Sequence, residues 1–302
     1  MVCTGALVTI NGIYADLHSH TTKSDGLLQP EVLLEKAERE GIEVLAITDH
    51  DSVDAHHALR HGGYNGNVRL ISGIEVSCYE HGREIHILGY HLDIDNEELL
   101  QLAIHLRAER DRRAILMVER LQNLRVTISV DEVKEVAAGA PIGRPHIAKV
   151  LVQRGFVTSH QKAFDIYLDA GKPAYVPRSV FTVTDAVNLI HRAGGIAVIA
   201  HPAKTYSEPR LFLTLLAGGI DGIEVYHPSH WYVTREYYRV LAEQHELVIT
   251  GGSDYHGSRD YDDRNFGTFG ISAERVELLD VRAQSLRQRG AQHDSEQGNY
   301  PH

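Results

Sequence analysis

The chain has 302 residues, 43% hydrophobic and 24% charged, which is the composition of a soluble globular protein with one large domain or a domain that carries an insertion. It has no apolar run near the roughly 20 residues of a membrane span, and its beginning lacks the features of a secretory signal. The formal net charge of −11 argues against a surface for long duplex nucleic acid. The two cysteines, Cys3 and Cys78, form no disulfide or zinc pattern and fit a cytoplasmic location.

Short apolar runs alternate with amphipathic helical patterns in the first third of the chain. A helix is predicted at 31–41, where apolar residues recur at helical spacing between a proline and a glycine. Buried strands are predicted at 44–48, 68–77 and 83–92, and a hairpin turn joins the last two. Between the strands at 44–48 and 68–77, three histidines are expected on the surface of a helix and outside any site: His56, His57 and His61.

The character of the chain changes at about residue 95. Residues 95–170 contain charged amphipathic helices without strong strand signals, which predicts a helical cap inserted into the main fold. Alternation then returns, with strands expected at 196–202, 222–228 and 247–256, each preceded by a helix, and a final helix at about 275–288. The predicted domains are therefore a discontinuous barrel (13–94 and 171–288), the cap (95–170) and a disordered polar tail (289–302).

Acids and histidines follow most of the predicted strands at their carboxyl ends. Strands that alternate with helices favour a parallel sheet, and convergence of the strand ends on one face is how a (β/α) barrel builds its active site. The groups concerned are His18/His20, Asp49/His50, Glu75, His201, Glu224/His227 and Asp254/His256.

These residue types predict a metal site with several ions. Residues two apart in a strand point to the same side, so His18 and His20 are placed to bind one ion together, and so are Asp254 and His256. Imidazole and carboxylate groups suit Zn, Mn and Fe. A single histidine pair is also compatible with a solvated loop, but repetition of the pattern at many strand ends favours metal binding.

Six stretches in this order resemble the motifs of the PHP (polymerase and histidinol phosphatase) superfamily. They are DLHSHTTKSDG, ITDHD, GIEVS, EIHILGY, IAHP and GSDYHG, within about residues 14–270. The resemblance implies a distorted seven-stranded (β/α) barrel, TIM-like, that holds up to three divalent ions (Mn, Fe or Zn). GRPHIAKVLV and DAGKPAYVP resemble stretches of bacterial 3′,5′-nucleotide bisphosphate phosphatases and related 5′→3′ exoribonucleases.

The resemblance also implies a ligand set for the three ions. The first ion would be held by His18, His20, Glu75 and Asp254; the second by Glu75, His86 and His201; the third by Asp25, His50 and His256. Asp49 and Asp51 are expected to orient imidazoles, with helix capping as the alternative for Asp51.

Three divalent ions outweigh the charge of three carboxylates, so the site is expected to take an anion such as phosphate. The hypothesis is a phosphoesterase in which a metal-bridging hydroxide attacks phosphorus, without a covalent enzyme intermediate. The expected substrates are nucleotides such as 3′-phosphoadenosine 5′-phosphate and short 5′-phosphorylated RNA. Oligomeric state is left open.

Further residues are candidates for proton transfer and substrate binding. His230 is favoured over His227 as proton donor to the leaving oxygen, with packing of a loop histidine as the alternative, and Glu224 is expected to support a ligand. Arg144 and His146 are expected to contact a substrate phosphate, or else to begin a helix with Pro145 in its first turn. Lys172 and Arg178 are weaker candidates for substrate binding; the alternative is that both are exposed charges.

Three other functions compete with this hypothesis. Histidinol-phosphate phosphatase belongs to the same superfamily, but a large cap suits a larger substrate. An amidohydrolase-type C–N hydrolase also uses metals in a barrel, yet its usual bridging lysine has no obvious counterpart here. A non-catalytic metal-binding PHP module is disfavoured by the complete ligand set and the lack of a polymerase region.

Overall fold

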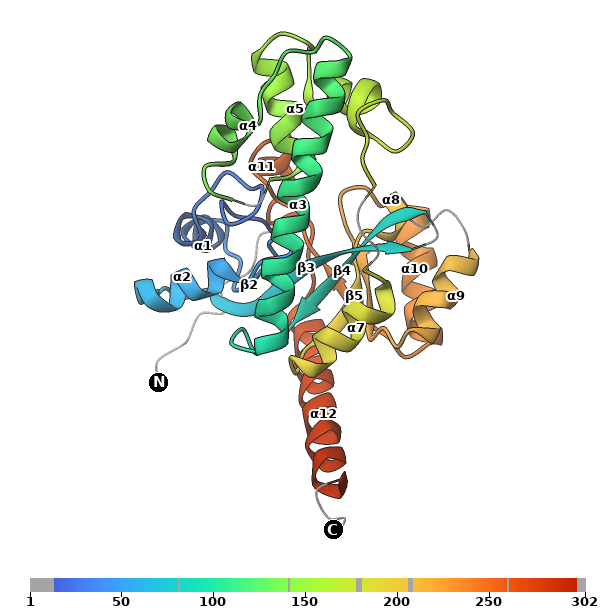
Figure 1. Cartoon of the computed structure of the whole chain (residues 1–302). Coiled ribbons are helices and arrows are strands. Elements are labelled where there is room, and N and C mark those ends of the chain that lie inside the picture. The colour runs from blue at the N-terminus through green and yellow to red at the C-terminus, as the bar shows by residue number, and fades with distance from the viewer. Residues whose placement is uncertain are drawn as a thin grey trace.

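The computed structural model describes residues 14–80, 82–140, 142–177, 181–205, 209–259 and 261–297. Within them seven strands form one sheet whose spatial order equals the chain order (Figure 1). The strands are β1 (Ala15–Asp16), β2 (Val44–Ile47), β3 (Arg69–Glu80), β4 (Arg83–Tyr90), β5 (Ile196–Ile199), β6 (Gly222–Tyr226) and β7 (Val248–Gly251).

The sheet is a distorted, nearly closed barrel, as the sequence predicted. β4 runs antiparallel to β3 and β5 because a short turn joins it to β3, whereas the other neighbouring strands pair in parallel. The segment after β1 meets the segment after β7: Leu17 N–H donates to Gly251 O at 3.0 Å, and His20 N–H donates to Tyr255 O at 2.8 Å. These bonds bring the first and last strand ends together.

Helices lie around the barrel and beyond one end of it. They are α1 (Pro30–Arg39), α2 (Asp54–Gly62), α3 (Glu97–Asn123), α4 (Val130–Ala137), α5 (Arg144–Gln153), α6 (His160–Ala163), the π-helix η1 (Phe164–Leu168), α7 (Val183–Arg192), α8 (Pro202–Thr205), α9 (Pro209–Ala217), α10 (Tyr232–Gln244), α11 (Asp262–Asn265) and α12 (Ala273–Gln297). Figure 1 shows α3 rising beside the sheet to α4 and α5. None of the helices in the described ranges is long and apolar enough to cross a membrane.

Residues 97–168, called the cap below, have an apolar core of their own. Met117 and Leu121 of α3, Val133 of α4, and Ile147 and Leu151 of α5 are buried in it. The barrel strands instead pack against α1, α2, α7, α10 and α12, and all four residues of both β2 and β5 are buried. Fully apolar strands of this kind are expected where helices cover both faces of a sheet.

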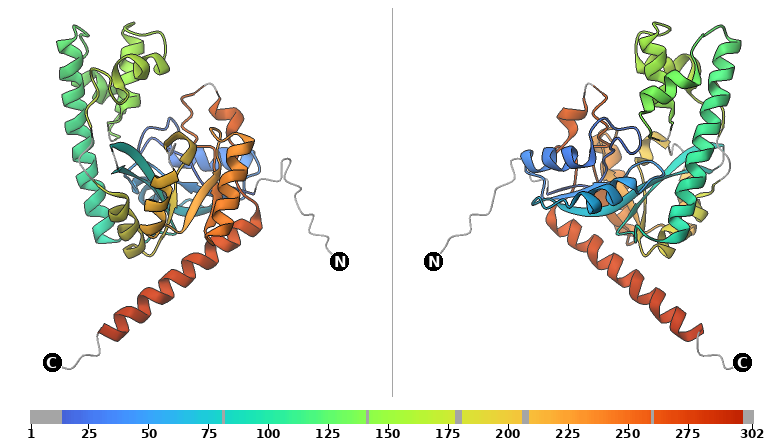
Figure 2. Two further views of the ribbon diagram at one scale, coloured as in Figure 1. Left: turned by 90° about the vertical axis from the view of Figure 1, so that its right-hand side faces the viewer. Right: turned by 60° about the vertical axis from the view of Figure 1, so that its left-hand side comes forward.

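Several boundaries differ from the sequence-based expectation: the strands expected at 196–202, 222–228 and 247–256 end earlier, at Ile199, Tyr226 and Gly251. The paired strand β3 continues to Glu80, through most of the stretch expected as the hairpin turn. The last helix extends to Gln297 and projects from the barrel (Figure 2), so 289–297 is helical and not a disordered tail. Polarity alone was misleading there, because Ala, Arg, Gln and Glu are good helix formers and no proline interrupts the segment. Residues 298–302 lie outside the described part.

Candidate metal centre and substrate pocket

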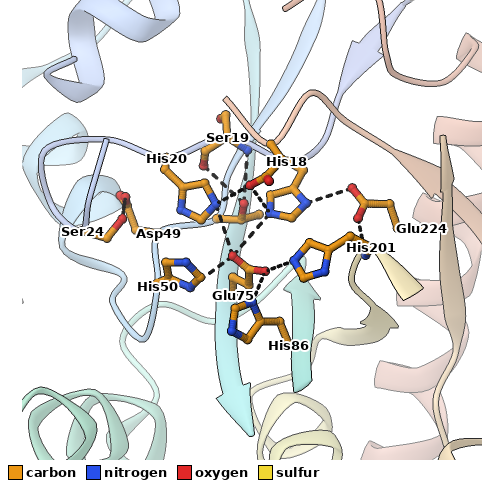
Figure 3. A network of polar contacts seen from close by, with 12 residues as sticks. His18, Ser19, His20, Ser24, Asp49, His50, Glu75, His86, His201 and Glu224 are labelled. Carbon is orange, nitrogen blue, oxygen red and sulfur yellow. Dashed lines mark hydrogen bonds and ion pairs between the residues drawn. The ribbon is translucent and has the colours of Figure 1, made fainter. Parts of the chain in front are cut away.

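Glu75 on β3 is the hub of a cluster of imidazoles at the barrel mouth (Figure 3). Its Oε1 lies 2.8 Å from His86 Nδ1 and 3.0 Å from His201 Nε2. Its Oε2 lies 3.4, 3.2 and 3.1 Å from one nitrogen each of His18, His20 and His50, respectively. One buried carboxylate therefore contacts five histidines from four parts of the chain.

Two further carboxylates complete the cluster. Asp254 Oδ1 lies 3.5 Å from both His18 Nε2 and His20 Nε2. Asp25 Oδ1 lies 3.3 Å from His256 Nε2. The structure thus brings together all nine residues implied as metal ligands, in overlapping groups whose ligand atoms lie within 4.8 Å of one another: His18/His20/Asp254, His18/Glu75/His201, His50/Glu75/His86 and His20/Asp25/His50/His256.

The backbone around His18 is fixed by close approach of two strand ends. Asp16 Oδ1 accepts hydrogen bonds from His18 N–H at 3.2 Å and Ser253 N–H at 3.0 Å. A Cβ atom on Gly252 would lie only 2.3 Å from His18 N, so no other residue fits there without a shift of the backbone. Burial raises the pKa of Asp16 to about 7. Asp16 and Gly252 therefore position His18 beside Asp254.

Three residues of this region have positive φ angles, which are uncommon for residues other than glycine. They are Asp51 at 53°, His201 at 28° and Asp254 at 52°. Asp254 is therefore not in an extended strand, and the two-residue spacing rule fails for it: the nearest metal-ligand groups separate Asp254 from His256. Strand geometry therefore does not bring these two side chains together, although His256 Nδ1 lies 3.6 Å from Asp254 Oδ1.

Glu224 of β6 supports the cluster from behind, as predicted. His18 Nδ1–H donates to its Oε1 at 2.9 Å, and His201 N–H donates to its Oε2 at 2.6 Å. Burial alone would raise the pKa of Glu224, but the neighbouring histidines, His18 above all, lower it to about 2. The ionised carboxylate holds His18 with Nε2 turned to the centre, the arrangement that metal-bound histidines adopt.

The unsatisfied atoms of the cluster fit bound cations. Several buried atoms lack a hydrogen-bond partner, although such a group costs about 1–3 kcal/mol when unsatisfied. They include His18 Nε2, both ring nitrogens of His20, His50 Nδ1, Glu75 Oε2 and His201 Nδ1. A divalent ion would be a partner for these nitrogens and carboxylate oxygens, so the residues present match a metal centre in position and in chemistry.

Electrostatics divides the imidazoles into two kinds. Burial lowers the pKa of His201 to about 4 and that of His50 well below its ordinary value, so both rings are neutral, the form that binds metal ions. Burial also lowers the pKa of His86, but the Glu75 carboxylate outweighs it and raises the pKa to about 9. Metal binding at His86 would therefore release a proton.

Comparison with known proteins assigns the chain to a family. The PHP domain model matches residues 16–168, half of the chain. The chain belongs to the PHP domain family. A solved structure from Bifidobacterium adolescentis, described as a metal-dependent phosphoesterase, is 30% identical with a TM-score of 0.79, over 89% of this chain and 96% of that one.

Two curated relatives of this PHP protein are similar over most of their length. The 5′-3′ exoribonuclease Rnm of Escherichia coli (strain K12) is 35% identical over 249 residues, covering 80% of this chain and 84% of that protein. The 3′,5′-nucleoside bisphosphate phosphatase of Chromobacterium violaceum is 34% identical over 262 residues, covering 81% of this chain and 89% of that protein. The present chain is a PHP-family phosphoesterase.

A pocket separates the metal centre from the cap of this PHP protein. Asp25, His50 and His86 line it on the barrel side, and Arg113 and Arg144 are among the residues that line it on the cap side. The cap side also has an apolar surface, formed by Ala114, Met117, Ile142, Ile147 and Phe164. A ligand with a negative charge and an apolar body would match both kinds of lining.

The arginines of this pocket are tied to a carboxylate beside the metal centre. Arg144 Nη2–H donates to Glu84 Oε2 at 2.9 Å, and Arg113 Nη2 lies 3.8 Å from the same oxygen. Glu84 precedes His86 by two residues on β4 and lies 3.6 Å from its Nε2. Sequence reasoning did not find Arg113 or Glu84, because no local pattern separates them from other charged residues.

The other predicted substrate contacts have different surroundings. Arg144 begins α5 and Pro145 lies in its first turn, so the helix-start interpretation also holds. His146 is buried, and its Nδ1 accepts a hydrogen bond from Gly143 N–H at 3.0 Å, which caps α5. Lys172 is exposed and is not among the residues that line the pocket. Arg178 lies outside the described residues.

His230, the favoured proton donor, is engaged by the backbone. Its Nδ1–H donates to Val225 O at 2.9 Å, and its Nε2 accepts from Ala203 N–H at 3.3 Å. Burial lowers its pKa, so the ring is neutral and has no further N–H for a leaving oxygen. Both ring nitrogens of His230 are thus engaged by backbone groups, which favours the alternative of a packed loop histidine.

His227 faces the centre. Its Nδ1 accepts from Ser229 N–H at 3.0 Å, which places the hydrogen of the neutral ring on Nε2, 3.4 Å from Asp254 Oδ2. Burial lowers its pKa to about 3, so the ring stays neutral over the physiological range. A neutral N–H at this position is a hydrogen-bond donor for an anion at the metal centre.

Among the described residues, the acids after β2 accept hydrogen bonds from backbone, hydroxyl and arginine groups, and the expected orientation of imidazoles by these acids is not seen. Asp49 accepts hydrogen bonds from Thr21 N–H, Thr21 Oγ1–H and Ser24 Oγ–H, and so fixes the loop that carries Asp25. Asp51 accepts from Ser77 N–H at 2.7 Å and Arg110 Nε–H at 2.7 Å. It does not cap α2, whose first flanking residue is Val53.

One of the histidines expected on a helix surface is instead buried. His56 is 4% exposed, and its Nε2 lies 3.0 Å from the carbonyl oxygens of Ile47 and Gly73. It joins α2 to β2 and β3, because a polar ring at this buried position needs backbone partners. His57 is half-buried and His61 is exposed, and the metal-ligand groups include none of the three.

Two cations beside Asp254 were also missed. Lys204 Nζ lies 2.8 Å and Arg259 NH1 3.2 Å from Asp254 Oδ2. Lys204 follows the IAHP stretch closely, and Arg259 follows GSDYHG, so proximity to these motifs was the signal available. Both place positive charge at the rim of the metal centre.

Proposed function

We propose that this PHP protein hydrolyses phosphomonoesters of nucleotides, with 3′,5′-bisphosphonucleotides such as 3′-phosphoadenosine 5′-phosphate as small substrates and short 5′-phosphorylated RNA as extended ones. The observation that carries the proposal is the pocket in which a histidine–carboxylate centre faces Arg113 and Arg144. A substrate with one phosphate at the centre and another toward the cap fits this distribution of charge. The names of the two curated relatives support the same class.

The proposed metal ligands are the nine residues of the cluster. We assign up to three divalent ions (Mn, Fe or Zn) to His18, His20, Asp25, His50, Glu75, His86, His201, Asp254 and His256. When bound, such ions lower the pKa of a coordinated water and neutralise charge on a phosphate.

The chain's own side chains would bind and orient the substrate. Arg144 carries a guanidinium whose planar donors suit a phosphate, and its ion pair with Glu84 shows that an anion is already accommodated there. His227 holds a proton on Nε2 next to Asp254 and would donate a hydrogen bond to the reacting phosphate. The cap would exclude water from the pocket. It belongs to an inserted domain for which we propose the boundaries 95–170.

Release of inorganic phosphate by the Mn²⁺-loaded protein tests the proposal. The substrates are 3′-phosphoadenosine 5′-phosphate, AMP, histidinol phosphate and a 5′-phosphorylated RNA pentanucleotide, with Asp25→Asn as the control variant. We expect preference for the bisphosphate over AMP and loss of activity in the variant. Activity on histidinol phosphate alone would refute the nucleotide substrates, and inactivity on all four with metal bound would indicate a non-catalytic module.

A further inference from the structure

Three consecutive residues form an unusually exposed apolar surface, the aromatic rim: Trp231, Tyr232 and Val233. Their exposed fractions are 84%, 77% and 77%, the largest among the large hydrophobic side chains of the described residues. Scattered exposed apolar residues need no explanation, but a contiguous exposed cluster marks a binding surface.

The aromatic rim adjoins the metal centre. The chain passes from His227, beside Asp254, to the buried His230, and the rim begins at the next residue. His230 Nε2 accepts a hydrogen bond from Ala203 N–H of α8, and α8 lies next to α10 in Figure 1. Lys204 follows Ala203 and Trp231 follows His230, so the exposed lysine and the exposed tryptophan are each one residue from this hydrogen bond.

The backbone of the aromatic rim is held rigidly although its side chains are exposed. His230 is fixed through both ring nitrogens, and Arg235 Nε–H donates to His230 O at 2.8 Å. Trp231 is the residue that flanks the start of α10. A rigid backbone that presents aromatic side chains loses little conformational freedom when a ligand binds.

The chemistry of these groups favours single-stranded nucleic acid. Bases stack on exposed aromatic rings without sequence preference, and cations beside such rings contact the phosphates. Stacking does not require a basic surface, which this chain of net charge −11 lacks. Lys204, whose side chain is 42% exposed, supplies local positive charge.

We propose that Trp231 and Tyr232 stack the bases of an oligonucleotide whose reacting phosphate lies at the metal centre, while Lys204 contacts the adjoining backbone. The inference rests on the proposed function and concerns its extended substrates, chains of several nucleotides. A mononucleotide, in contrast, would be bound within the pocket and would not reach the rim.

A second copy of the chain is the rival occupant, because Tyr237 and Val240 continue the apolar surface along α10. Their exposed fractions are only 52% and 40%. Exposure therefore decreases along α10 away from the aromatic rim, which fits a ligand bound at the rim. A stable dimer buries roughly 800 Å² on each partner, far more than the three residues of the rim supply.

Trp231 is the only tryptophan of the chain, so its fluorescence reports directly on the rim. Zinc-loaded protein is titrated with AMP and with hydrolysis-resistant phosphorothioate oligoadenylates of two, three and five nucleotides. We expect the emission to change with the longer oligomers and not with AMP. An emission that is unchanged by the pentamer while the pentamer binds, as shown by equilibrium dialysis, would overturn the proposal.

Kinetics of variants provides the second test. Trp231→Ala should raise the KM for the RNA pentanucleotide by about 5- to 150-fold, leave the KM for 3′-phosphoadenosine 5′-phosphate unchanged, and be largely rescued by Trp231→Phe. Tyr237→Ala, within α10, is the matched control and should have no effect.

An equal KM for the pentanucleotide in wild type and Trp231→Ala would overturn the proposal, as would a wild-type dimer that Trp231→Ala converts to a monomer in light scattering. Absence of hydrolysis of every substrate would refute the proposed function, whereas the fluorescence titration would still decide whether the rim binds oligonucleotides.

Discussion

The two sides of the pocket are built from opposite kinds of side chain. The barrel side presents His50, His86 and Asp25, which are ligands for cations, whereas the cap side presents Arg113 and Arg144, which are donors to anions. The barrel groups converge from several strand ends, and the cap groups come from two helices. Under the proposed function, the barrel side would supply the chemistry and the cap side would select the anion.

The two sides also differ in how their polar groups are satisfied. Buried atoms of the barrel cluster, such as His18 Nε2 and Glu75 Oε2, lack hydrogen-bond partners. The cap arginines are paired within the protein, Arg144 with Glu84 and Arg110 with Asp51. A bound ion would therefore complete the barrel side, whereas a bound anion on the cap side would compete with a carboxylate.

Removal of the Glu75 charge should have the largest effect on metal binding and activity. Glu75→Gln takes away the charge that five imidazoles share, so bound metal and phosphatase activity should both fall by more than about 100-fold. Metal content by mass spectrometry and phosphate release measure the two losses. Glu97→Gln, which alters an exposed residue of α3, is the control. Full activity of Glu75→Gln would contradict the central role given to this carboxylate.

Breaking the connection between cap and barrel should reduce stability most. Arg110 is buried and donates to Asp51 at 2.7 Å and to Ser77 Oγ at 3.0 Å. Arg110→Met leaves the Asp51 carboxylate buried without its guanidinium, which should lower the free energy of unfolding by about 3–5 kcal/mol. Urea denaturation followed by circular dichroism gives the value. Arg112→Met, at an exposed arginine of the same helix, should change stability little, and equal effects of the two variants would refute the connection.

A smaller effect is expected from the cap arginine that faces the centre. Arg144→Ala should raise the KM for 3′-phosphoadenosine 5′-phosphate by about 10- to 100-fold, the loss expected for a hydrogen bond between charged groups. The KM for AMP should rise less, because AMP lacks the second phosphate. Arg154→Ala is the matched control, because Arg154 lies at the other end of α5 and forms an ion pair with Glu132. A uniform loss of kcat with unchanged KM values would exclude a binding role for Arg144.

The smallest effect is expected at Lys172. Because its side chain is exposed and away from the pocket lining, Lys172→Ala should change the KM for the bisphosphate by less than about twofold. Steady-state phosphate release is sufficient to check this. A rise comparable to that of Arg144→Ala would mean that the pocket extends further along the cap than the structure shows.

Prediction from sequence succeeded where a local pattern determines the outcome. The apolar runs predicted as strands at 44–48 and 196–202 correspond to β2 and β5, because short, wholly apolar segments between helices have few other stable arrangements. The polar residues at strand ends were correctly expected to meet, since neighbouring strands of a barrel end on one face. His18, His50 and His201, which follow β1, β2 and β5, are the clearest case, whereas Glu75 and His86 lie within β3 and β4.

Prediction failed where a side chain's role depends on what lies against it. His230 and His227 occur in one short stretch, yet the first is held by Val225 O and Ala203 N–H and the second faces Asp254. His56 has the spacing of a surface residue on a helix, but the helix packs that face onto β2 and β3. Hydrogen-bond partners distant in sequence decided both cases.

The sequence by itself determined the order of strands and helices, the helical nature of residues 97–168 and the identity of the side chains at the barrel mouth, because periodicity and residue chemistry are local properties. Only the tertiary structure decided that Glu75 is shared by five imidazoles, that Arg110 joins cap to barrel, and that Trp231 stands exposed beside the centre. Each of these facts depends on packing of segments far apart in the chain, and burial and charge pairing exist only once those segments are in contact.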